Sequence, residues 1–358
     1  YNDSPGDSVI RPGMEIVSIN GRQSSELIQK ILPKLSGDGF VESGKIRRLE
    51  RGFATQYWLF IDSTAQFTIS ARDEKGKTFQ ATVPGVLNTE RESNRKNNPV
   101  NQVIRTNMEK LDGDPQNISL RFVSDGIGYL RIRGFEGNQF MAQLDSLFVV
   151  LNQKKTKALI LDLRGNGGGV DNYGAYLVAQ FMDKTFRYFD RIHLTNISPS
   201  FTTWNSGTAE RLKNGVDHDP AGGFLIRPSL HSGVGVQQPG KHPFAGQAYV
   251  LTDGITFSTA ADVTAVLKNA QKAIFVGEET GGTFEGNTSG LNAQVNLPHS
   301  GLRVRVQMME YFNAVSNTSR GRGTLPDHVV EKRIADLLKG IDLPLTKAIE
   351  LARSNTRQ

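Results

Sequence analysis

The stretch Ala158-Leu-Ile-Leu-Asp-Leu-Arg-Gly-Asn-Gly-Gly-Gly169 decides the fold class that we expect for this chain. Its first six residues form a short, almost continuously apolar run, which is typical of a strand buried on both faces of a parallel sheet. The glycines that follow can adopt positive φ, so consecutive N–H groups can point into one cavity, as an anion or oxyanion pocket requires. The alternative interpretation is a tight turn between a strand and a helix. The spacing fits neither a Walker loop nor a dinucleotide-binding loop.

Outward from this stretch, short apolar strands alternate with helical patterns. Helices placed between apolar strands predict a layered α/β core with mostly parallel crossovers. Residues 196–245 are rich in Gly, Pro, Ser and His and lack clear periodicity, and a connection of that length is usually functional or mobile. We predict strands over residues 119–123, 127–131, 188–194, 247–252, 273–277 and 304–309, and helices over residues 140–151, 173–181 and 258–269.

The first 86 residues predict a small β-rich module. Turns at Pro12-Gly13 and Asn20-Gly21 flank a short alternating strand, and a helix is expected over residues 26–35. Residues 87–117 are polar and predict a linker with a short helix over 103–111. The remaining expectations for the module are a polar loop over residues 37–52, strands over 57–61, 66–72 and 78–83, and a place in the core for the apolar run 57–61.

Composition excludes several classes of protein. The 358 residues include 42 Lys and Arg against 36 Asp and Glu, a net charge of +6, and the basic residues are dispersed rather than gathered in the stripe that nucleic-acid binding needs. The absence of cysteine excludes disulfides, a thiolate nucleophile and thiolate metal sites. No apolar stretch is long enough to span a bilayer, and no ligand cluster indicates a metal or a cofactor. The chain opens at Tyr1 without an initiator Met, so we expect a fragment or a processed form.

A second motif, Thr252-Asp-Gly-Ile-Thr-Phe-Ser258-Thr-Ala-Ala-Asp262, places a serine where a predicted strand ends and a predicted helix begins. The dipole of a helix N-terminus favours negative charge that develops at that hydroxyl. The small residues after it let a substrate backbone approach. The arrangement is analogous to a nucleophile elbow, although the G-x-S-x-G spelling is absent. Taken alone, the segment favours a plain helix N-cap at Ser258 over a nucleophile.

The third motif is the glycine-rich loop Gly277-Glu-Glu-Thr-Gly-Gly-Thr-Phe-Glu-Gly286, which follows another predicted strand. In their order along the chain, the three motifs resemble the tail-specific, or C-terminal processing, serine peptidases and their tricorn-core relatives, in particular the exported peptidases of Bacteroidetes-like bacteria. The stretch Arg11-Pro-Gly-Met-Glu-Ile-Val-Ser-Ile-Asn-Gly21 resembles part of the PDZ domain that those enzymes carry. Gly323-Thr-Leu-Pro-Asp327 resembles their closing strand.

The resemblance implies a fold and a domain organisation. It implies a ClpP/crotonase-like layered α/β peptidase core over residues 118–350, which follows the linker at 87–117. Residues 1–86 would be a PDZ-like domain that is incomplete at its N-terminus, carries an insertion at about 37–66, and presents the C-terminal tail of a substrate. The resemblance also implies an exported, periplasmic or cell-surface location and makes no prediction of oligomeric state.

The resemblance further implies an activity and the residues that carry it. Ser258 would be the nucleophile of a serine endopeptidase that cleaves proteins or peptides through an acyl-enzyme. The backbone amides of Thr259 and of either Gly168 or Gly169 would hold the oxyanion. Such an enzyme needs a protein or peptide substrate and no cofactor or metal.

The sequence departs from the family at the general base that a serine nucleophile requires. The lysine that classical members place in the third loop falls at Thr283, and no lysine occurs between Lys272 and Lys332. The tricorn-like branch uses a histidine instead. Three explanations stay open: a histidine ahead of Tyr1, which we favour, a histidine of the 196–245 loop, or loss of the base and of catalysis. The loop candidates are His218 and His231.

A base is commonly oriented by a carboxylate. Glu285 is the best-placed candidate because it lies in the third loop, and Glu278, Glu279 and Glu310 are further candidates. Two other functions also stay open. A non-catalytic peptide- or ligand-binding protein on the same scaffold would explain the missing lysine, although the serine kept between glycine-rich loops argues against it. An acyl-thioester enzyme of the crotonase type shares the core, but the PDZ-like start and Ser258 argue against it.

Overall fold

The structure is a computed structural model that describes residues 1–4, 6–316 and 320–356. The chain forms two compact units, and each is assembled from segments that are separate in the sequence. Unit 1 comprises Tyr1–Ser36, Lys45–Pro115 and Val330–Lys347, and unit 2 comprises Gly37–Gly44, Gln116–Val329 and the C-terminal segment from Ala348.

Unit 1 contains a four-stranded antiparallel sheet in the order β2-β1-β3-β4. The Asn20-Gly21 turn joins β1 to β2 with both residues at positive φ, which suits the twist of a two-residue hairpin. A small apolar core forms around Ile19, Leu27 and Tyr57. The elements are β1 (Glu15–Ile19), β2 (Arg22–Gln23), α1 (Ser24–Ile31), η1 (Leu32–Lys34), β3 (Gln66–Arg72), β4 (Thr78–Pro84), α3 (Asn88–Asn97), η2 (Pro99–Asn101), α4 (Gln102–Asp112) and α9 (Ile334–Leu338).

Helix α2 (Ser43–Phe60) overturns two expectations. The loop predicted over 37–52 is confirmed only for 37–42, and the strand predicted over 57–61 is wrong, because one helix with a kink at Gly52 covers almost all the rest of that stretch. Tyr57 is buried as expected, but Trp58 and Leu59 are 61% and 53% exposed, so the run does not lie wholly in the core. The strands predicted at 66–72 and 78–83 and the helix predicted at 103–111 are confirmed by β3, β4 and α4.

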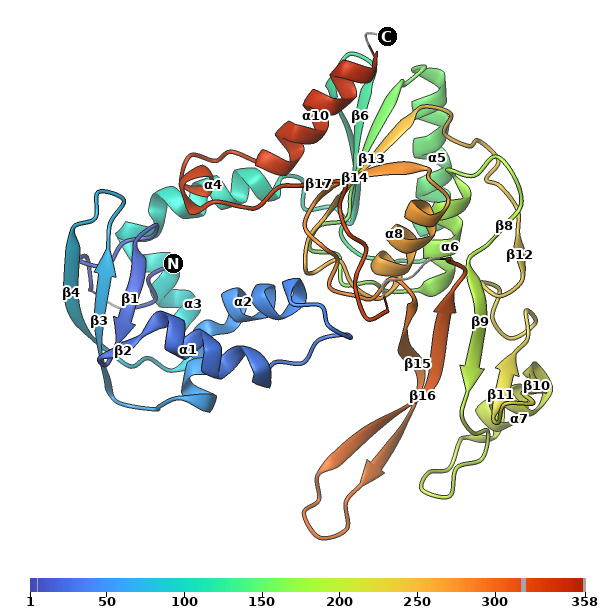
Figure 1. Cartoon of the computed structure of the whole chain (residues 1–358), viewed down its shortest axis with the longest axis horizontal. Coiled ribbons are helices and arrows are strands. Elements are labelled where there is room, and N and C mark those ends of the chain that lie inside the picture. Colours follow the sequence, from blue (N-terminus) through green and yellow to red (C-terminus); the bar gives the residue numbers. More distant parts are fainter. Residues whose placement is uncertain (5, 317–319, 357–358) are drawn as a thin grey trace. The chain divides into compact units, whose positions relative to one another are not determined.

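Unit 2 is built on a six-stranded sheet in the order β17-β14-β13-β7-β6-β5 (Figure 1). Every pair in it is parallel except the β5–β6 hairpin, so the predicted α/β core with parallel crossovers is confirmed. All five residues of β7 are buried, as expected for a strand covered on both faces. The strands are β5 (Ile118–Ser124), β6 (Ile127–Ile132), β7 (Ala158–Asp162), β13 (Gln247–Thr252), β14 (Ala273–Gly277) and β17 (His328–Val329).

The crossover helices of unit 2 pack on this sheet and on each other. Helix α8 is the most deeply placed, with nine consecutive residues buried from Thr259 to Leu267. It contacts α6, β14 and β16, which explains why its sequence is apolar or small all round rather than striped. The helices are α5 (Phe140–Gln153), α6 (Asp171–Ala179), α7 (Ser206–Gly215), α8 (Thr259–Asn269) and α10 (Leu343–Thr356), of which α10 belongs to unit 2 from Ala348 onward.

A second, five-stranded sheet of unit 2 has the order β10-β11-β9-β16-β15. Its last two strands form a long hairpin (Figure 1), and β15 was not predicted because its sequence is largely polar. The region 196–245 holds only short elements. The strands outside the first sheet are β8 (Phe186–Arg187), β9 (Phe189–Leu194), β10 (Val216–His218), β11 (Phe224–Ile226), β12 (Val236–Gln237), β15 (Gly286–Asn296) and β16 (Arg303–Asn313). Among the helices that the structure describes, none is long and apolar enough to cross a membrane.

Candidate active site

The three turns that the sequence singled out meet at Ser258. A side-chain carbon placed on Gly168 would lie 2.7 Å from Cβ of Ser258, and one placed on Gly282 would lie 3.3 Å from its backbone nitrogen. The strands that carry these turns, β7, β13 and β14, are neighbours and run parallel, so their carboxyl ends share one edge of the sheet. Three distant stretches of sequence therefore form one site.

Hydrogen bonds between buried groups hold the three turns together. The amide of Phe257, just before Ser258, donates to the carbonyl of Asn166 at 3.0 Å. The amide of Gly281 donates to the carbonyl of Thr256 at 2.9 Å. Asn166 and Thr256 are fully buried, and sequence reasoning gave neither a separate role. Both are short polar residues next to a motif, which was the available signal.

Ser258 itself has an unusual backbone. Its φ is 50° and its ψ is −132°, a region that non-glycine residues rarely occupy and that costs on the order of 1–3 kcal/mol. It stands at the N-cap position of α8, yet its side chain makes no capping hydrogen bond. The interpretation of Ser258 as a plain N-cap is therefore wrong. The half-buried residue lies at the start of α8, but its hydroxyl makes no hydrogen bond that caps the helix.

The backbone amides of Gly168 and Gly169 differ in whether they have a hydrogen-bond acceptor among the described residues. The amide of Gly168 donates to Oδ1 of Asn166 at 2.9 Å, so it is already engaged. The carbonyl of Gly168 accepts from the amide of Phe135 at 3.0 Å. Because carbonyl and N–H point in opposite directions across a trans peptide, the amide of Gly169 faces away from Phe135. In the described part of the chain it has no acceptor.

A charged network fixes the start of the first turn. Oδ2 of Asp162 accepts hydrogen bonds of 2.6 Å from both the hydroxyl of Tyr129 and Nη2 of Arg164. Burial alone would raise the pKa of Asp162, but the Arg164 guanidinium and the Tyr129 hydroxyl outweigh burial and lower the pKa to about 2. The carboxylate stays ionised and holds the chain as it leaves β7.

A second buried carboxyl lies one helical turn beyond Ser258. The amide nitrogens of Asn313 and Asn287 donate to Asp262 at 3.0 and 3.2 Å, and no cation faces the carboxyl among the contacts of the described residues. Desolvation by burial raises the pKa of Asp262 to about 8, and the nearby Asp171 carboxylate adds to the rise against the two amide hydrogen bonds. Asp262 is therefore a neutral acid at pH 7.

The model of peptidase family S41 matches residues 126–330, which is more than half of the chain and includes all three turns. The chain belongs to peptidase family S41. It is a serine peptidase, as the motifs predicted.

Two solved structures of CPAF agree with the fold of this S41 peptidase, and a third solved structure is similar in sequence to part of the chain. The structure of mature CPAF complexed with lactacystin is 16% identical, covers 97% of this chain and 78% of CPAF, and has a TM-score of 0.61. Uncomplexed mature CPAF is 17% identical, with 97% and 77% covered and a TM-score of 0.61. A putative peptidase from Parabacteroides merdae is 22% identical, with 70% and 69% covered and a TM-score of 0.49.

The third turn of this S41 peptidase carries Thr283 where classical members have lysine. The hydroxyl of Thr283 donates to the carbonyl of Gly286, so it serves the turn. In Glu285, Oε1 accepts from the amide of Gly321 at 2.7 Å, whereas Oε2 is buried and has no partner among the described residues. A buried carboxylate oxygen without a donor is costly, so Glu285 is the acidic group here that could accept a further hydrogen bond. Glu279 is instead paired with Arg322 at 2.6 Å.

The two loop histidines have hydrogen-bond partners other than Ser258. Nε2 of His231 lies 3.4 Å from Oδ2 of Asp171, and its Nδ1 accepts from the amide of Gly233 at 3.2 Å. Nδ1 of His218 lies 3.1 Å from the carbonyl of its own neighbour, Asp219, on an exposed hairpin. Neither ring has a hydrogen bond to Ser258 among the described residues.

The short segment Gly37–Gly44 belongs to unit 2 and lies against two of its turns. The amide of Phe40 donates to the carbonyl of Gly321 at 2.7 Å. A side-chain carbon on Gly44 would lie 3.2 Å from the carbonyl oxygen of Gly254 and 3.3 Å from Cα of Gly281. Only a residue without a side chain fits there unless the turns shift.

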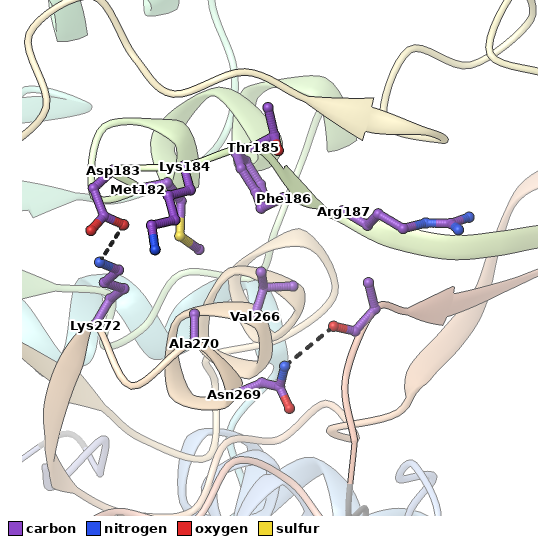
Figure 2. A pocket seen from close by; sticks show the side chains of 11 residues that line it. Met182, Asp183, Lys184, Thr185, Phe186, Arg187, Val266, Asn269, Ala270 and Lys272 are labelled. Atoms are coloured by element: carbon purple, nitrogen blue, oxygen red, sulfur yellow. Dashed lines mark hydrogen bonds and ion pairs between the residues drawn. The ribbon is translucent and has the colours of Figure 1, made fainter.

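A cavity of about 390 Å³ lies elsewhere in unit 2 (Figure 2). It opens between the 182–187 segment and the C-terminal half of α8, where Val266 and Ala270 form its floor and the Lys272–Asp183 ion pair its rim. Ser258 is at the opposite end of α8, so this cavity is not part of the site around it. Among the described residues, no group of three His, Asp or Glu side chains could hold a metal.

Proposed function

We propose that this S41 peptidase cleaves protein or peptide chains through an acyl-enzyme on Ser258. The observation that carries the proposal is the conformation of Ser258: a strained backbone, no capping role, and contact with Gly168 on one side and Gly282 on the other. Strain of this kind persists only where the surrounding structure enforces it, and it gathers at functional sites. The family gives the reaction class, and the local geometry supports Ser258 as the residue that carries it.

The amides of Thr259 and Gly169 are the proposed oxyanion donors. Thr259 is the first residue of α8, so its amide has no acceptor within the helix. Of the two glycines that the sequence left open, Gly169 is favoured because the amide of Gly168 donates to Asn166. Gly168 has a different proposed role: because it has no side chain, the first turn can lie against Ser258.

The proposed base remains the histidine expected ahead of Tyr1. The support is that His231 and His218 are engaged elsewhere and that Thr283 replaces the family's lysine. Glu285 is the proposed partner that orients this base, since its buried Oε2 has no donor among the described residues.

The proposed cycle follows the chemistry of acyl transfer. The base removes the Ser258 proton as the hydroxyl attacks the peptide carbonyl. The tetrahedral oxyanion is held by the two amides, and the protonated base then gives its proton to the leaving amine. Water, activated by the same base, releases the acid and restores Ser258.

Labelling with a fluorophosphonate probe tests the proposal. We expect the full-length gene product to be labelled at Ser258, as identified by peptide mass spectrometry, and the Ser258→Ala variant not to be labelled. The same assay on residues 1–358 alone addresses the base, since labelling of that chain would place the base within it. Absence of labelling at Ser258 in the full-length gene product would overturn the proposal.

We also propose that residues 1–86 contain a PDZ-like domain and that residues 118–350 hold most of the peptidase core, to which the structure adds 37–44, while most of the expected linker at 87–117 packs with unit 1. The support is the resemblance of the 11–21 stretch and the small four-stranded sheet with α1 beside it. Such a domain binds an extended peptide as an added strand. Titration with a peptide that ends in a free carboxylate, compared with its C-terminal amide, measures whether it recognises a substrate tail.

A further inference from the structure

We propose that the hydroxyl of Thr259, anchored by Asp171, sets the spacing between the two oxyanion donors. Thr259 and Asp171 are positioning residues in this view, and neither takes part in a bond-making step. The inference rests on the proposed function of Ser258 and goes beyond it, because it assigns a role to two side chains that the acyl-transfer mechanism does not itself require.

Gly169 depends on hydrogen bonds to its neighbouring peptides because glycine itself restricts φ and ψ less than any other residue. It sits at φ 145°, and a side-chain carbon there would lie on the carbonyl oxygen of Phe135. The peptide before it is fixed where the Gly168 carbonyl accepts from the amide of Phe135. The peptide after it is fixed on one side by the Val170 amide, which donates to the carbonyl of Phe135 at 2.7 Å.

Thr259 fixes that second peptide from the opposite side. Its Oγ1 donates to the carbonyl of Gly169 at 3.0 Å. One residue thus carries a proposed donor amide and, through its side chain, holds the residue that carries the other. Catalytic hydrogen bonds to an oxyanion depend on donors that are already in place, so a fixed distance between the two amides has direct chemical value.

Asp171 orients the Thr259 hydroxyl. Its Oδ1 lies 3.1 Å from Oγ1 of Thr259, so the single hydroxyl hydrogen is shared between Asp171 and Gly169. The carboxylate also accepts a hydrogen bond from the hydroxyl of Tyr311, and Nε2 of His231 lies 3.4 Å from its Oδ2. The ring of His231 packs edge-on against Tyr311, with centroids 5.8 Å apart. Tyr311 and His231 therefore hold the Asp171 carboxylate, which in turn orients the Thr259 hydroxyl.

The methyl group of Thr259 has a separate packing role. A side-chain carbon on Gly174 would lie 2.6 Å from Cγ2 of Thr259, so α6 and α8 approach closely at this methyl. Thr259→Val keeps this methyl and removes only the hydroxyl, whereas Thr259→Ser keeps the hydroxyl and removes the methyl. The two variants separate positioning from packing.

The test uses the full-length gene product and a fluorophosphonate probe, with the maximal inactivation rate and the half-saturating probe concentration measured separately. For Thr259→Val we expect the maximal rate to fall about ten- to a hundredfold, with half-saturation changed less than about twofold, because ground-state binding is intact and the oxyanion is poorly held. Thr259→Ser should stay within about threefold of wild type. A Val variant that reacts like wild type, or a Ser variant that loses as much as Val, would overturn the inference.

Asp171→Asn is an independent test of the inference. If Thr259→Val does not fold, this variant is the deciding test. We expect a fall in the maximal rate with unchanged half-saturation, whereas the matched control Asp183→Asn, which alters an exposed ion pair with Lys272, should leave both unchanged. An unchanged maximal rate in Asp171→Asn would count against the inference. Labelling of Ser258→Ala at another residue would instead defeat the proposed function, so the two failures are distinguishable.

Discussion

Two turns of unit 2 leave neighbouring parallel strands and lead into helices. They differ in which residues adopt positive φ and in how the buried carboxyl near each turn is stabilised. In the turn from β7 to α6, positive φ falls only on glycines, Gly165, Gly168 and Gly169, and the buried Asp162 is neutralised by Arg164. In the turn from β13 to α8, positive φ falls on Ser258, and the buried Asp262 meets only amides.

The contrast indicates where the molecule gives up stability for function. The first turn satisfies local rules: glycine adopts positive φ without strain, and a buried charge has an opposite charge beside it. The second turn instead has positive φ on a serine, and one helical turn later a buried carboxyl has no opposite charge beside it and keeps its proton. Local conflicts of this kind are expected at functional sites and are rare elsewhere.

The largest effect on activity is expected from a substitution that adds a side chain between the two turns. Gly168→Ala places a carbon 2.7 Å from Cβ of Ser258 and forces a side chain on a residue at φ 104°. We expect the rate of fluorophosphonate labelling to fall about a thousandfold, comparable to loss of an oxyanion donor. Gly167→Ala is the matched control, because a carbon there meets nothing within 4 Å, and its labelling rate should be unchanged. Equal rates in the two variants would mean that the first turn does not shape the site.

Asp162→Asn should change the stability of the fold. It removes the negative charge that faces the Arg164 side chain, which is 10% exposed, so we expect a loss of about 3 kcal/mol at pH 7 in urea unfolding. Because the pKa of Asp162 is lowered to about 2 in the folded state, its contribution is present above pH 4 and is lost as the pH falls toward 2. The gap between variant and wild type should therefore narrow in acid. A gap that does not depend on pH would contradict the ionised state of Asp162.

Asp262→Asn should produce the opposite pH dependence. The pKa of Asp262 is raised to about 8, so the folded protein keeps a proton that the unfolded chain releases near pH 4. Wild-type stability should therefore decline between pH 4 and pH 8 relative to the Asn variant, by at most about 1.4 kcal/mol per pH unit, and level off above that. Parallel stability curves for the two proteins would show that Asp262 is ionised when folded.

The smallest effect concerns the strain at Ser258. Ser258→Gly and Ser258→Ala both remove the hydroxyl, but only glycine adopts φ 50° without strain. We expect the Gly variant to be more stable than the Ala variant by about 1 kcal/mol in thermal unfolding. An Ala variant as stable as the Gly variant would show that the backbone at this position is not strained.

Much of this comparison could be predicted from the sequence. The apolar runs of β7, β13 and β14 identify buried parallel strands, and parallel neighbours bring their carboxyl ends together, so the meeting of the three turns follows from the pattern. The pattern could not predict contacts between residues that lie far apart in the sequence. The partners of Asp262 are Asn287 and Asn313, which lie on β15 and β16, and β15 is too polar to be recognised as a strand.

Helix α2 was missed for a different reason. Its glycines and charged residues suggested a loop, yet Leu49, Phe53 and Tyr57 recur every four residues, which is the spacing of one helical face. The signal was present and was outweighed by the polar residues around it. Neither His218 nor His231 is hydrogen-bonded to Ser258 in the described chain, so the histidine expected ahead of Tyr1 stays a prediction.

The segment Gly37–Gly44 has a consequence for how this enzyme can be taken apart or recombined. It is encoded between parts of unit 1, yet it packs on the turns at Gly254 and Gly281 of the peptidase unit. A gene fragment that begins at Gln116 would therefore omit part of the peptidase unit. Exchanging the N-terminal domain with that of a relative would also exchange backbone that lies against the turns at Gly254 and Gly281. An exchange of the N-terminal domain would therefore also alter the surroundings of the candidate site.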